Sequence, residues 1–425
     1  MEHDAVVFIE LNGQPVPAGK IRITEEGRWS RSEFAYGRRY LARPDAVAID
    51  PVMLPLNEKA FETPPEFPLF NGVRDAAPDA WGRKLIDRYV LRQFGRPAGE
   101  AEYLLASQHG TRIGALQFGP TPSGPGRVLD FNLPSARTDL GNLEALQRQV
   151  DAVQSEEDLP DQLVNFIAPG SDLGGARPKA TVTIDGFPWL VKFGIDHERL
   201  PMEAVEAGCL DLAEMCGIDT CERQVVEIAC RPALLLKRFD REVADGGELQ
   251  RVHMISSLTL LGAHESDHGL SGYADIYDAL RRYGAPGDHS ETIYRRMVLN
   301  VLTGNTDDHY RNHAFLHGAD GYRPSPVYDI TPTLQTSSSR YLFLHLGKAG
   351  AGREATLEAA VAGAASLGLQ PDQAKAIATE MAEIVGRNWR DVMERRGVGD
   401  DAIRLMEGSF AQAGRQLEGG PGCGM

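Results

Sequence analysis

The stretch Asn305-Thr306-Asp307-Asp308-His309-Tyr310-Arg311-Asn312 decides the fold that we predict. It follows an apolar segment with helical spacing and precedes the β-like Ala314-Phe315-Leu316. Asn312 comes five positions after Asp307 (312 − 307 = 5), and another acid, Asp329, follows a short way downstream. Asp and Asn also gather in turns, because their side chains bond to nearby backbone groups. A turn that caps helices is therefore the structural alternative.

An Asp, an Asn five positions on and a second Asp are typical of the catalytic loop and metal-binding Asp of protein kinases. Phosphate transfer from ATP needs hard oxygen ligands that hold Mg²⁺, which Asn312 and Asp329 can supply. It also needs a carboxylate that orients the acceptor hydroxyl and takes up its proton. That role is open to Asp307, so the pattern predicts a phosphotransfer site.

Two upstream features favour the same chemistry. The glycine-rich segment 170–179 can present successive backbone N–H groups to an anion. Lys192 lies 17 positions after Gly175 (192 − 175 = 17), among apolar residues of a strand-like segment. Such a lysine needs a partner, which nucleotide phosphates and a helical glutamate, Glu203 or Glu206, would provide. A plain turn and a lysine that snorkels at a sheet edge are the alternatives.

The hydrophobic pattern changes along the chain from β-rich to helical. Short β-like runs separated by turns fill the first 60 residues, including Val6 to Ile9, Ile21 to Ile23 and the aromatic stretch Phe34 to Tyr40. Later segments predict helices at 83–91, 141–155 and 201–215, a hairpin over 180–193 and a strand at 233–239. Beyond about residue 250 we expect mostly helices, over 255–261, 294–302 and 357–393.

Composition excludes several classes of protein. The 425 residues suffice for two or three domains, and 44 basic against 60 acidic residues give a net charge of −16. Such a surface repels nucleic-acid backbones, so we expect no direct, non-specific binding to nucleic acid. Five cysteines without close pairs favour neither a disulfide framework nor a zinc site. The acidic start and the lack of a long apolar run predict a soluble cytoplasmic protein.

The sequence resembles the HipA family, the serine/threonine kinase toxins of type II toxin–antitoxin modules. The resemblance covers most of the chain, and these motifs carry it: Leu11-Asn12-Gly13, Tyr40-Leu41, Phe70-Asn71-Gly72, Asp79-Ala80-Trp81-Gly82-Arg83, 110–116, 173–179, Leu236-Lys237-Arg238-Phe239-Asp240-Arg241, Asn305 to Asn312 and Tyr328-Asp329. It implies an α+β, protein-kinase-like fold of two lobes. A β-rich subdomain is expected over residues 1–120, a mixed N-lobe over 121–245 and an all-helical C-lobe over 246–425.

The resemblance also implies roles for single residues. Asp307 would be the catalytic base, Asn312 and Asp329 the ligands of Mg²⁺, and Lys192 the lysine that anchors ATP phosphates, with Glu206 as its ion-pair partner. The remaining nucleotide contacts are expected from Gly174, Gly175, Ala176 and the backbone around Lys237 and Phe239. For His309 we expect a structural role in the loop, with a proton carrier as the alternative, and for Asp308 a solvated or supporting acid. Arg311 is either a phosphate contact or a surface residue.

Family members often phosphorylate a serine of the glycine-rich loop. Ser171 lies in that loop, but Asp172 occupies the position where the serine is usual. Ser171 is therefore the candidate autophosphorylation site, whereas Asp172 would either weaken ATP binding by repulsion or cap a turn. The segment 251–257 also departs from the acidic, glutamine-rich family pattern, which leaves the substrate open.

We expect a kinase toxin that phosphorylates a component of translation and partners a HipB-like DNA-binding antitoxin, with DNA contacted only through that partner. A dimer or heterotetramer is the family expectation. The alternative is a catalytically weak nucleotide-binding protein that tunes an antitoxin's grip on DNA. A third possibility keeps the fold and transfers AMP instead of phosphate.

Overall fold

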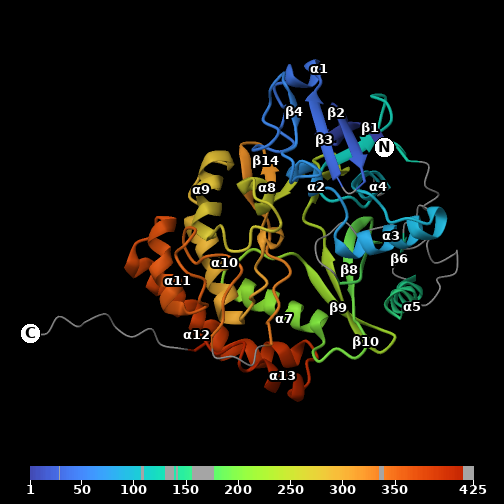
Figure 1. Cartoon of the computed structure of the whole chain (residues 1–425). Helices are drawn as coiled ribbons and strands as arrows, with labels where there is room; N and C mark the ends of the chain where they lie inside the picture. Colours follow the sequence, from blue (N-terminus) through green and yellow to red (C-terminus); the bar gives the residue numbers. More distant parts are fainter. Residues whose placement is uncertain are drawn as a thin grey trace, which may run out of the picture. The chain divides into compact units, whose positions relative to one another are not determined.

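The computed structural model describes residues 1–27, 29–106, 110–129, 138–139, 142–155, 177–334 and 339–414 (Figure 1). The chain divides into two compact units, each built from separate stretches. The first comprises Met1–Ile195, Glu222–His264 and Ala314–Gly318, and the second Asp196–Cys221, Glu265–His313 and Ala319–Met425. No helix within the described ranges is long and apolar enough to cross a lipid bilayer.

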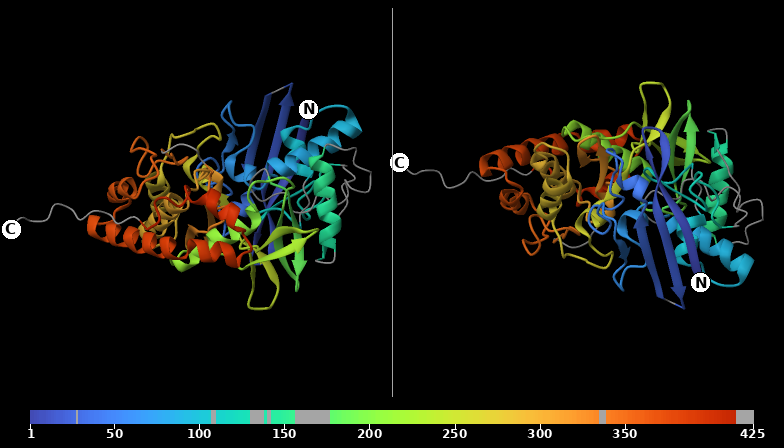
Figure 2. Two further views of the ribbon diagram at one scale, coloured as in Figure 1. Left: turned by 90° about the horizontal axis from the view of Figure 1, so that it is seen from below. Right: turned by 90° about the horizontal axis from the view of Figure 1, so that it is seen from above.

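An antiparallel sheet opens the first unit and confirms the β-rich start. Its strand order is β4-β3-β2-β1-β5, and its strands are β1 Glu2–Leu11, β2 Gln14–Glu26, β3 Trp29–Tyr36, β4 Ala60–Glu62 and β5 Leu116–Gly119 (Figures 1 and 2). Asn12 and Gly13 join β1 to β2 with positive φ angles of 51° and 73°, as a tight hairpin turn requires. Alternate residues of β3, Ser32, Phe34 and Tyr36, are buried, so one face of this sheet forms a core.

The aromatic stretch of residues 34–40 is only partly a strand. β3 ends at Tyr36, and α1 (Arg38–Leu41) begins after Gly37, contrary to our expectation of β-structure up to Tyr40. The helical turn stacks the Tyr40 ring on that of Tyr36, with ring centroids 5.8 Å apart. The Tyr40 hydroxyl also donates to the carbonyl of Val47. These contacts favour a turn of helix over continued β-structure, and the local residue pattern does not reveal them.

A second sheet of the first unit has the order β6-β7-β8-β10-β9. Its strands are β6 Thr138–Asp139, β7 Lys179–Ile184, β8 Phe187–Phe193, β9 Arg223–Ile228 and β10 Arg231–Lys237. β7 and β8 form the predicted hairpin, whose turn residues Asp185 and Gly186 have φ angles of 51° and 79°. One face packs against α3 (Ala80–Phe94) and α5 (Leu143–Gln154), both predicted as helices, and Figure 2 shows α5 beside the strands.

Shorter elements complete the first unit. They are α2 Asn71–Arg74, α4 Glu100–Ala106, β11 Arg241–Val243, β12 Leu249–Arg251, β13 Met254–Ser256, α8 Ser257–Leu261 and β14 Ala314–Gly318. The helix expected over 255–261 is wrong in its first part, because Ile255 belongs to β13 and pairs with Phe315 of β14. Asp75 accepts hydrogen bonds from the backbone and hydroxyl of Ser256 and from the hydroxyl of Thr259, which fixes the change from strand to helix.

In the described part of the second unit, the regular structure is helical apart from the short strand β15 (Gly321–Pro324). Its helices are α7 Met202–Met215, α9 Tyr273–Tyr283, α10 Ser290–Thr303, η2 Tyr310–Asn312, α11 Leu357–Gly363, η3 Ala364–Leu367, α12 Pro371–Arg395 and α13 Asp400–Met406. α7 packs on α12, where a Cβ atom at Gly208 would lie 2.6 Å from the sulfur of Met393. Glycine there lets the two helices approach closely. Strand-rich and helical units together confirm the α+β fold.

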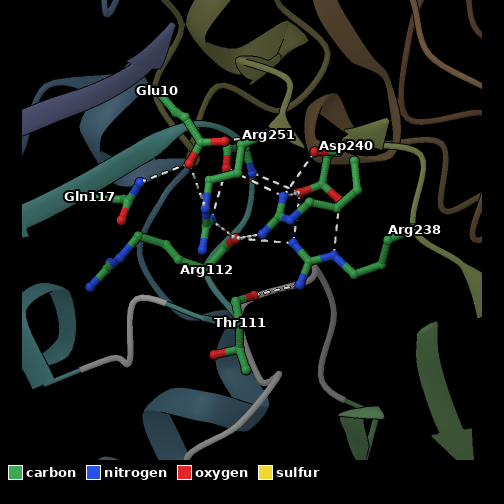
Figure 3. Close-up of polar contacts among 9 residues, drawn as sticks. Glu10, Thr111, Arg112, Gln117, Arg238, Asp240 and Arg251 are labelled. Atoms are coloured by element: carbon green, nitrogen blue, oxygen red, sulfur yellow. Dashed lines mark hydrogen bonds and ion pairs between the residues drawn. The ribbon is translucent and has the colours of Figure 1, made fainter. Parts of the chain in front are cut away.

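A buried ion cluster fixes the end of β10 in the first unit (Figure 3). Asp240 accepts hydrogen bonds from the guanidinium groups of Arg238 and Arg241 and from the backbone N–H of Gly114. Arg238 and Arg241 also donate to the carbonyl of Arg112. Burial alone would raise the pKa of Asp240, but the two arginines hold it well below its usual range. The cluster therefore joins the segment after β10 to the segment before β5.

We predict that Asp240→Asn destabilises the protein by about 3–5 kcal/mol, since it leaves buried cations uncompensated. The N–H₂ group of the new asparagine would also face the N–H groups of Arg238 and Arg241, which are donors as well. The control is Glu62→Gln, which breaks an exposed ion pair with Arg31 and should cost under about 1 kcal/mol. Urea unfolding at neutral pH measures both. The contribution of Asp240 is fully present above the ordinary aspartate pKa and is lost as pH falls below it. Equal effects of the two variants would contradict this account.

Candidate catalytic site

Lys192 lies in β8, inside the second sheet. Its Cα atom pairs with that of Lys179 in β7 on one side and with that of Leu234 in β10 on the other. Directly paired residues point to the same face of an antiparallel sheet, so the two lysines share a face. Both are buried, with 4% of Lys192 and 3% of Lys179 exposed. A buried ammonium group on this face would attract an anion such as a phosphate.

Lys179 forms a buried ion pair that sequence reasoning missed. Its Nζ atom donates to Asp79 over 2.5 Å. The other carboxylate oxygen of Asp79 accepts from the backbone N–H of Gly82 and caps α3. The motif that contains Asp79 stands out in the sequence. A pair separated by 100 positions leaves no local signal, however.

Glu206 lies on α7 in the second unit and contacts the segment that contains Asp329. One of its carboxylate oxygens accepts a hydrogen bond from the backbone N–H of Asp329 over 3.0 Å. Glu206 and Glu203 are both buried, each with 2% of its surface exposed. Lys192, its expected ion-pair partner, belongs to the first unit. Within its own unit, Glu206 therefore holds the backbone of an expected metal ligand.

Asp329 has the left-handed backbone conformation, with φ at 57°. This conformation costs a non-glycine residue roughly 1–2 kcal/mol, so its surroundings must stabilise it. On its N-terminal side, the Tyr328 hydroxyl donates to the carbonyl of Arg311, and the N–H of Val327 donates to the carbonyl of Asp219. Together with the bond to Glu206, these bonds fix the backbone position of Asp329, from which its side chain extends.

The loop that contains Asp307 and Asn312 begins where α10 stops. Gly304 ends the helix with φ at 63°, a left-handed conformation that favours glycine. At the other end of the loop, the Asn312 side-chain N–H donates to the backbone carbonyl of Asp307 over 2.6 Å. This bond uses the N–H₂ group of Asn312 and not its amide oxygen. The structure thus brings the expected base and one expected metal ligand into direct contact.

Asp308 is buried, contrary to our expectation of a solvated acid, although a supporting role agrees with its contacts. It accepts hydrogen bonds from the Tyr273 hydroxyl (2.7 Å) and from the backbone N–H of Phe343 (2.5 Å). Tyr273 in turn accepts from the side chain of Asn300, which accepts from that of Asn305. Burial raises the pKa of Asp308 to about 7, against the effect of these donors. This directional chain anchors the loop to α9 and α10.

Asp307 is exposed and electrostatically linked to its neighbours. Partial desolvation raises the pKa of its carboxyl group, nearby His309 lowers it, and the negative charge of Asp329 raises it. A raised pKa increases the proton affinity of Asp307, which suits a group that accepts a proton.

His309 and Arg311 support the loop. The ring Nδ1 of His309 accepts the backbone N–H of Arg311 and caps η2. The His309 ring also meets the Phe343 ring edge to face, with centroids 6.2 Å apart. Arg311 forms an ion pair with Glu265 over 2.7 Å. These contacts favour the structural interpretation of His309 and a surface ion pair for Arg311.

The donor set fits a magnesium ion bound together with phosphates. Asn312 and Asp329 offer an amide oxygen and a carboxylate, which are the hard ligands that Mg²⁺ prefers. In the part of the chain that the structure describes, no group of three or more His, Cys, Asp or Glu forms a metal cluster. Mg²⁺ commonly uses one or two carboxylates and takes its other ligands from phosphate and water, so two protein ligands suffice.

The expected nucleotide contacts are only partly within the described residues. Ser171, Asp172, Gly174, Gly175 and Ala176 lie outside them. At the expected hinge, the backbone N–H of Lys237 donates to the carbonyl of Glu222, so it cannot also donate to an adenine while that bond stands. Phe239 follows β10 and is partly exposed.

Comparison with known proteins identifies the family. A family model described as the HipA-like C-terminal domain matches residues 171–389, about half of the chain. The chain belongs to the HipA family. The matched range includes Lys192, Glu206, the loop from Asn305 to Asn312, and Asp329.

Two curated relatives and a solved structure are also similar to this chain. "Putative kinase Y4mE" of Sinorhizobium fredii is 26% identical over 318 residues, which are 71% of this chain and 72% of the relative. The serine/threonine-protein kinase toxin HipA of Shewanella oneidensis is 23% identical over 189 residues, 38% of this chain and 43% of the relative. The solved complex of Shewanella oneidensis HipA with HipB and operator DNA matches with a TM-score of 0.64. It is 16% identical and covers 96% of this chain and 95% of the other, which shows a shared fold.

The bond between Glu206 and Asp329 makes a direct prediction. In Glu206→Leu, hydrogen exchange at the Asp329 amide should accelerate about 10-fold or more, because a bond to a charged acceptor contributes about 1.5–3 kcal/mol. Glu206→Gln keeps an acceptor oxygen and should accelerate exchange at the Asp329 amide less than Glu206→Leu does. Glu214→Gln, an exposed change on the same helix, is the control. Amide exchange followed by NMR measures all three, and unchanged protection in Glu206→Leu would refute the role.

Proposed function

We propose that this chain is an ATP- and Mg²⁺-dependent serine/threonine protein kinase and the toxin of a HipA/HipB-like toxin–antitoxin module. The observation that carries the proposal is the hydrogen bond between Asn312 and Asp307, next to the fixed backbone of Asp329. In this bond the side chain of one proposed metal ligand donates to the backbone of the proposed base, and both residues belong to the second unit. Membership of the HipA family and two kinase-named relatives support it.

In the proposed reaction, Asp307 orients the hydroxyl of a serine or threonine toward the terminal phosphorus of ATP. The hydroxyl oxygen forms a new bond to that phosphorus, and the bond from phosphorus to the bridging oxygen breaks. ADP leaves with the electron pair, and Asp307 takes up the hydroxyl proton. Most of the rate enhancement comes from position and charge, since the protein forms no covalent bond.

The remaining site residues hold the nucleotide in this proposal. Asn312 and Asp329 would bind Mg²⁺, which neutralises charge on the phosphates when bound. Lys192 would contact the phosphates from the sheet, and Glu206 keeps the backbone of Asp329 in place. Lys179 shares the face of Lys192 and keeps Asp79 as its counter-ion. The glycine-rich loop and the backbone at Phe239 would complete the nucleotide contacts.

Membership of the HipA family supports a proposal for the partner and for the substrate. The matching complex contains HipB and operator DNA, so we propose a HipB-like antitoxin as partner, through which this acidic chain contacts DNA only indirectly. We propose a component of translation as substrate and the cytoplasm as the place of action.

We predict that Asp307→Asn reduces phosphate transfer by about 10²–10⁴-fold while ATP binding changes little, because the amide cannot accept the proton. The measurement is intact-mass spectrometry before and after incubation with ATP and Mg²⁺, with calorimetry for nucleotide binding. Peptide mapping of any phosphate also tests Ser171. Asp320→Asn, an exposed aspartate in the turn after β14, is the matched control and should leave transfer unchanged.

The possible outcomes separate the alternatives. Full phosphate transfer by Asp307→Asn would exclude Asp307 as the base. A gain of AMP mass would replace phosphotransfer with nucleotidyl transfer. The chain could instead bind nucleotide but transfer phosphate neither to itself nor to translation components. That result would favour the alternative, a nucleotide-binding protein that partners an antitoxin.

A second prediction concerns the metal. Asp329→Asn and Asn312→Ala should each raise the Mg²⁺ concentration needed for half-maximal transfer by about 10-fold or more, since each removes a ligand. Asn388→Ala on α12 removes an asparagine whose side chain donates to the carbonyl of Ile384, and it serves as the control. A Mg²⁺ titration of the transfer rate measures the shift. Unchanged curves in both variants would exclude these residues as ligands.

A further inference from the structure

A small polar pocket lies inside the second unit, behind the loop of the candidate site. It is lined by Arg296 and Asn300 of α10, by Asn305, Asn312 and His313 of the loop, and by Val327, Tyr328 and Ile330 of the segment that contains Asp329. Its free space is about that of one water molecule. Any occupant therefore consists of a single small atom or molecule.

Three side-chain atoms at this pocket have no hydrogen-bond partner among the described residues. They are Nε of Arg296, Oδ1 of Asn305 and Nε2 of His313. All three residues are buried, with 3%, 2% and 5% of their surface exposed. Buried polar atoms in native proteins nearly always have a partner, from the protein or from an ordered water. Three such atoms around one pocket indicate a shared ligand.

The neighbouring bonds define which of the three atoms donate and which accept. Arg296 Nε carries a hydrogen and only donates. Asn305 uses its N–H₂ group to donate to Asn300, so the atom at the pocket is the carbonyl oxygen, an acceptor. The His313 ring bonds to the backbone of Asp308 through its other nitrogen, Nδ1. With the proton on Nδ1, the ring presents Nε2 as an acceptor.

We propose that this pocket binds one ordered water molecule. Water accepts a hydrogen bond from Arg296 and donates its two hydrogens to Asn305 and His313, so every orphaned atom gains a partner. A halide ion would accept from Arg296 but would face two acceptors. Potassium or ammonium would suit the acceptors but would be repelled by the buried guanidinium group.

The water extends the hydrogen-bond chain that anchors the loop. Asn305 and His313 flank the segment that contains Asp307 and Asn312, and the water ties both to Arg296 of α10. The guanidinium group of Arg296 also donates to the carbonyl of Ser325, in the chain that leads to Asp329. One water thus connects the helix to both ends of the loop, whatever reaction the site performs.

A crystal structure of the full chain at 1.8 Å or better tests the proposal. The expected result is a density peak 2.7–3.2 Å from all three atoms that refines as water. A second crystal soaked in sodium bromide should show no anomalous peak there. An empty pocket, or a bromide peak in it, would overturn the proposal. Neither result depends on kinase activity, so its failure is distinct from failure of the proposed function.

Two matched variants test the assignment of Asn305. Asn305→Asp and Asn305→Leu both lose the N–H₂ group that donates to Asn300, but only leucine loses the acceptor oxygen. The water peak should persist in the aspartate variant and vanish in the leucine variant. A peak unchanged in Asn305→Leu would remove Asn305 from the site. The parent structure and its bromide soak decide the proposal if a variant does not fold.

Discussion

One buried carboxylate, that of Asp308, holds the loop on which the candidate site depends. Removing a charge from water is costly, and the protein offsets this cost with hydrogen bonds from the Tyr273 hydroxyl and the backbone of Phe343. The Tyr273 hydroxyl in turn accepts from the amide of Asn300. Because these donors come from separate elements of the second unit, the loop is fixed only when that unit is folded. Because Asp307 directly precedes Asp308 in the chain, the buried contacts of Asp308 also fix the backbone of the exposed Asp307.

Much of the architecture follows from the sequence because local patterns control it. The turn residues Asn12-Gly13 and Asp185-Gly186 predict their hairpins, since few residue pairs adopt positive φ at low cost. The helix α10 and the glycine that ends it are equally local. The order of Asp307, Asn312 and Asp329 predicts that they serve one site, and the contact between Asn312 and Asp307 agrees with this.

Contacts across long stretches of chain account for what the sequence could not reveal. The bond from Asp329 to Glu206 spans 123 positions, and the ion pair of Lys179 with Asp79 spans 100. Neither produces a periodic pattern. The sequence left Asp308 as either a solvated or a supporting acid, because its hydrogen bonds come from Tyr273 and Phe343, which are distant in sequence. The strand at Ile255 follows from pairing with β14. These features depend on tertiary contacts.

The packing of α7 on α12 has a consequence for how the chain folds during synthesis. α7 ends at Met215, and α12 begins at Pro371, 156 positions later (371 − 215 = 156). At a ribosomal rate of about 5–20 residues per second, α7 waits about 8–30 s for its partner. During that time its apolar surface stays uncovered by α12, within reach of chaperones. The second unit can therefore close only late in translation, and the site that it contains forms after most of the chain has left the ribosome.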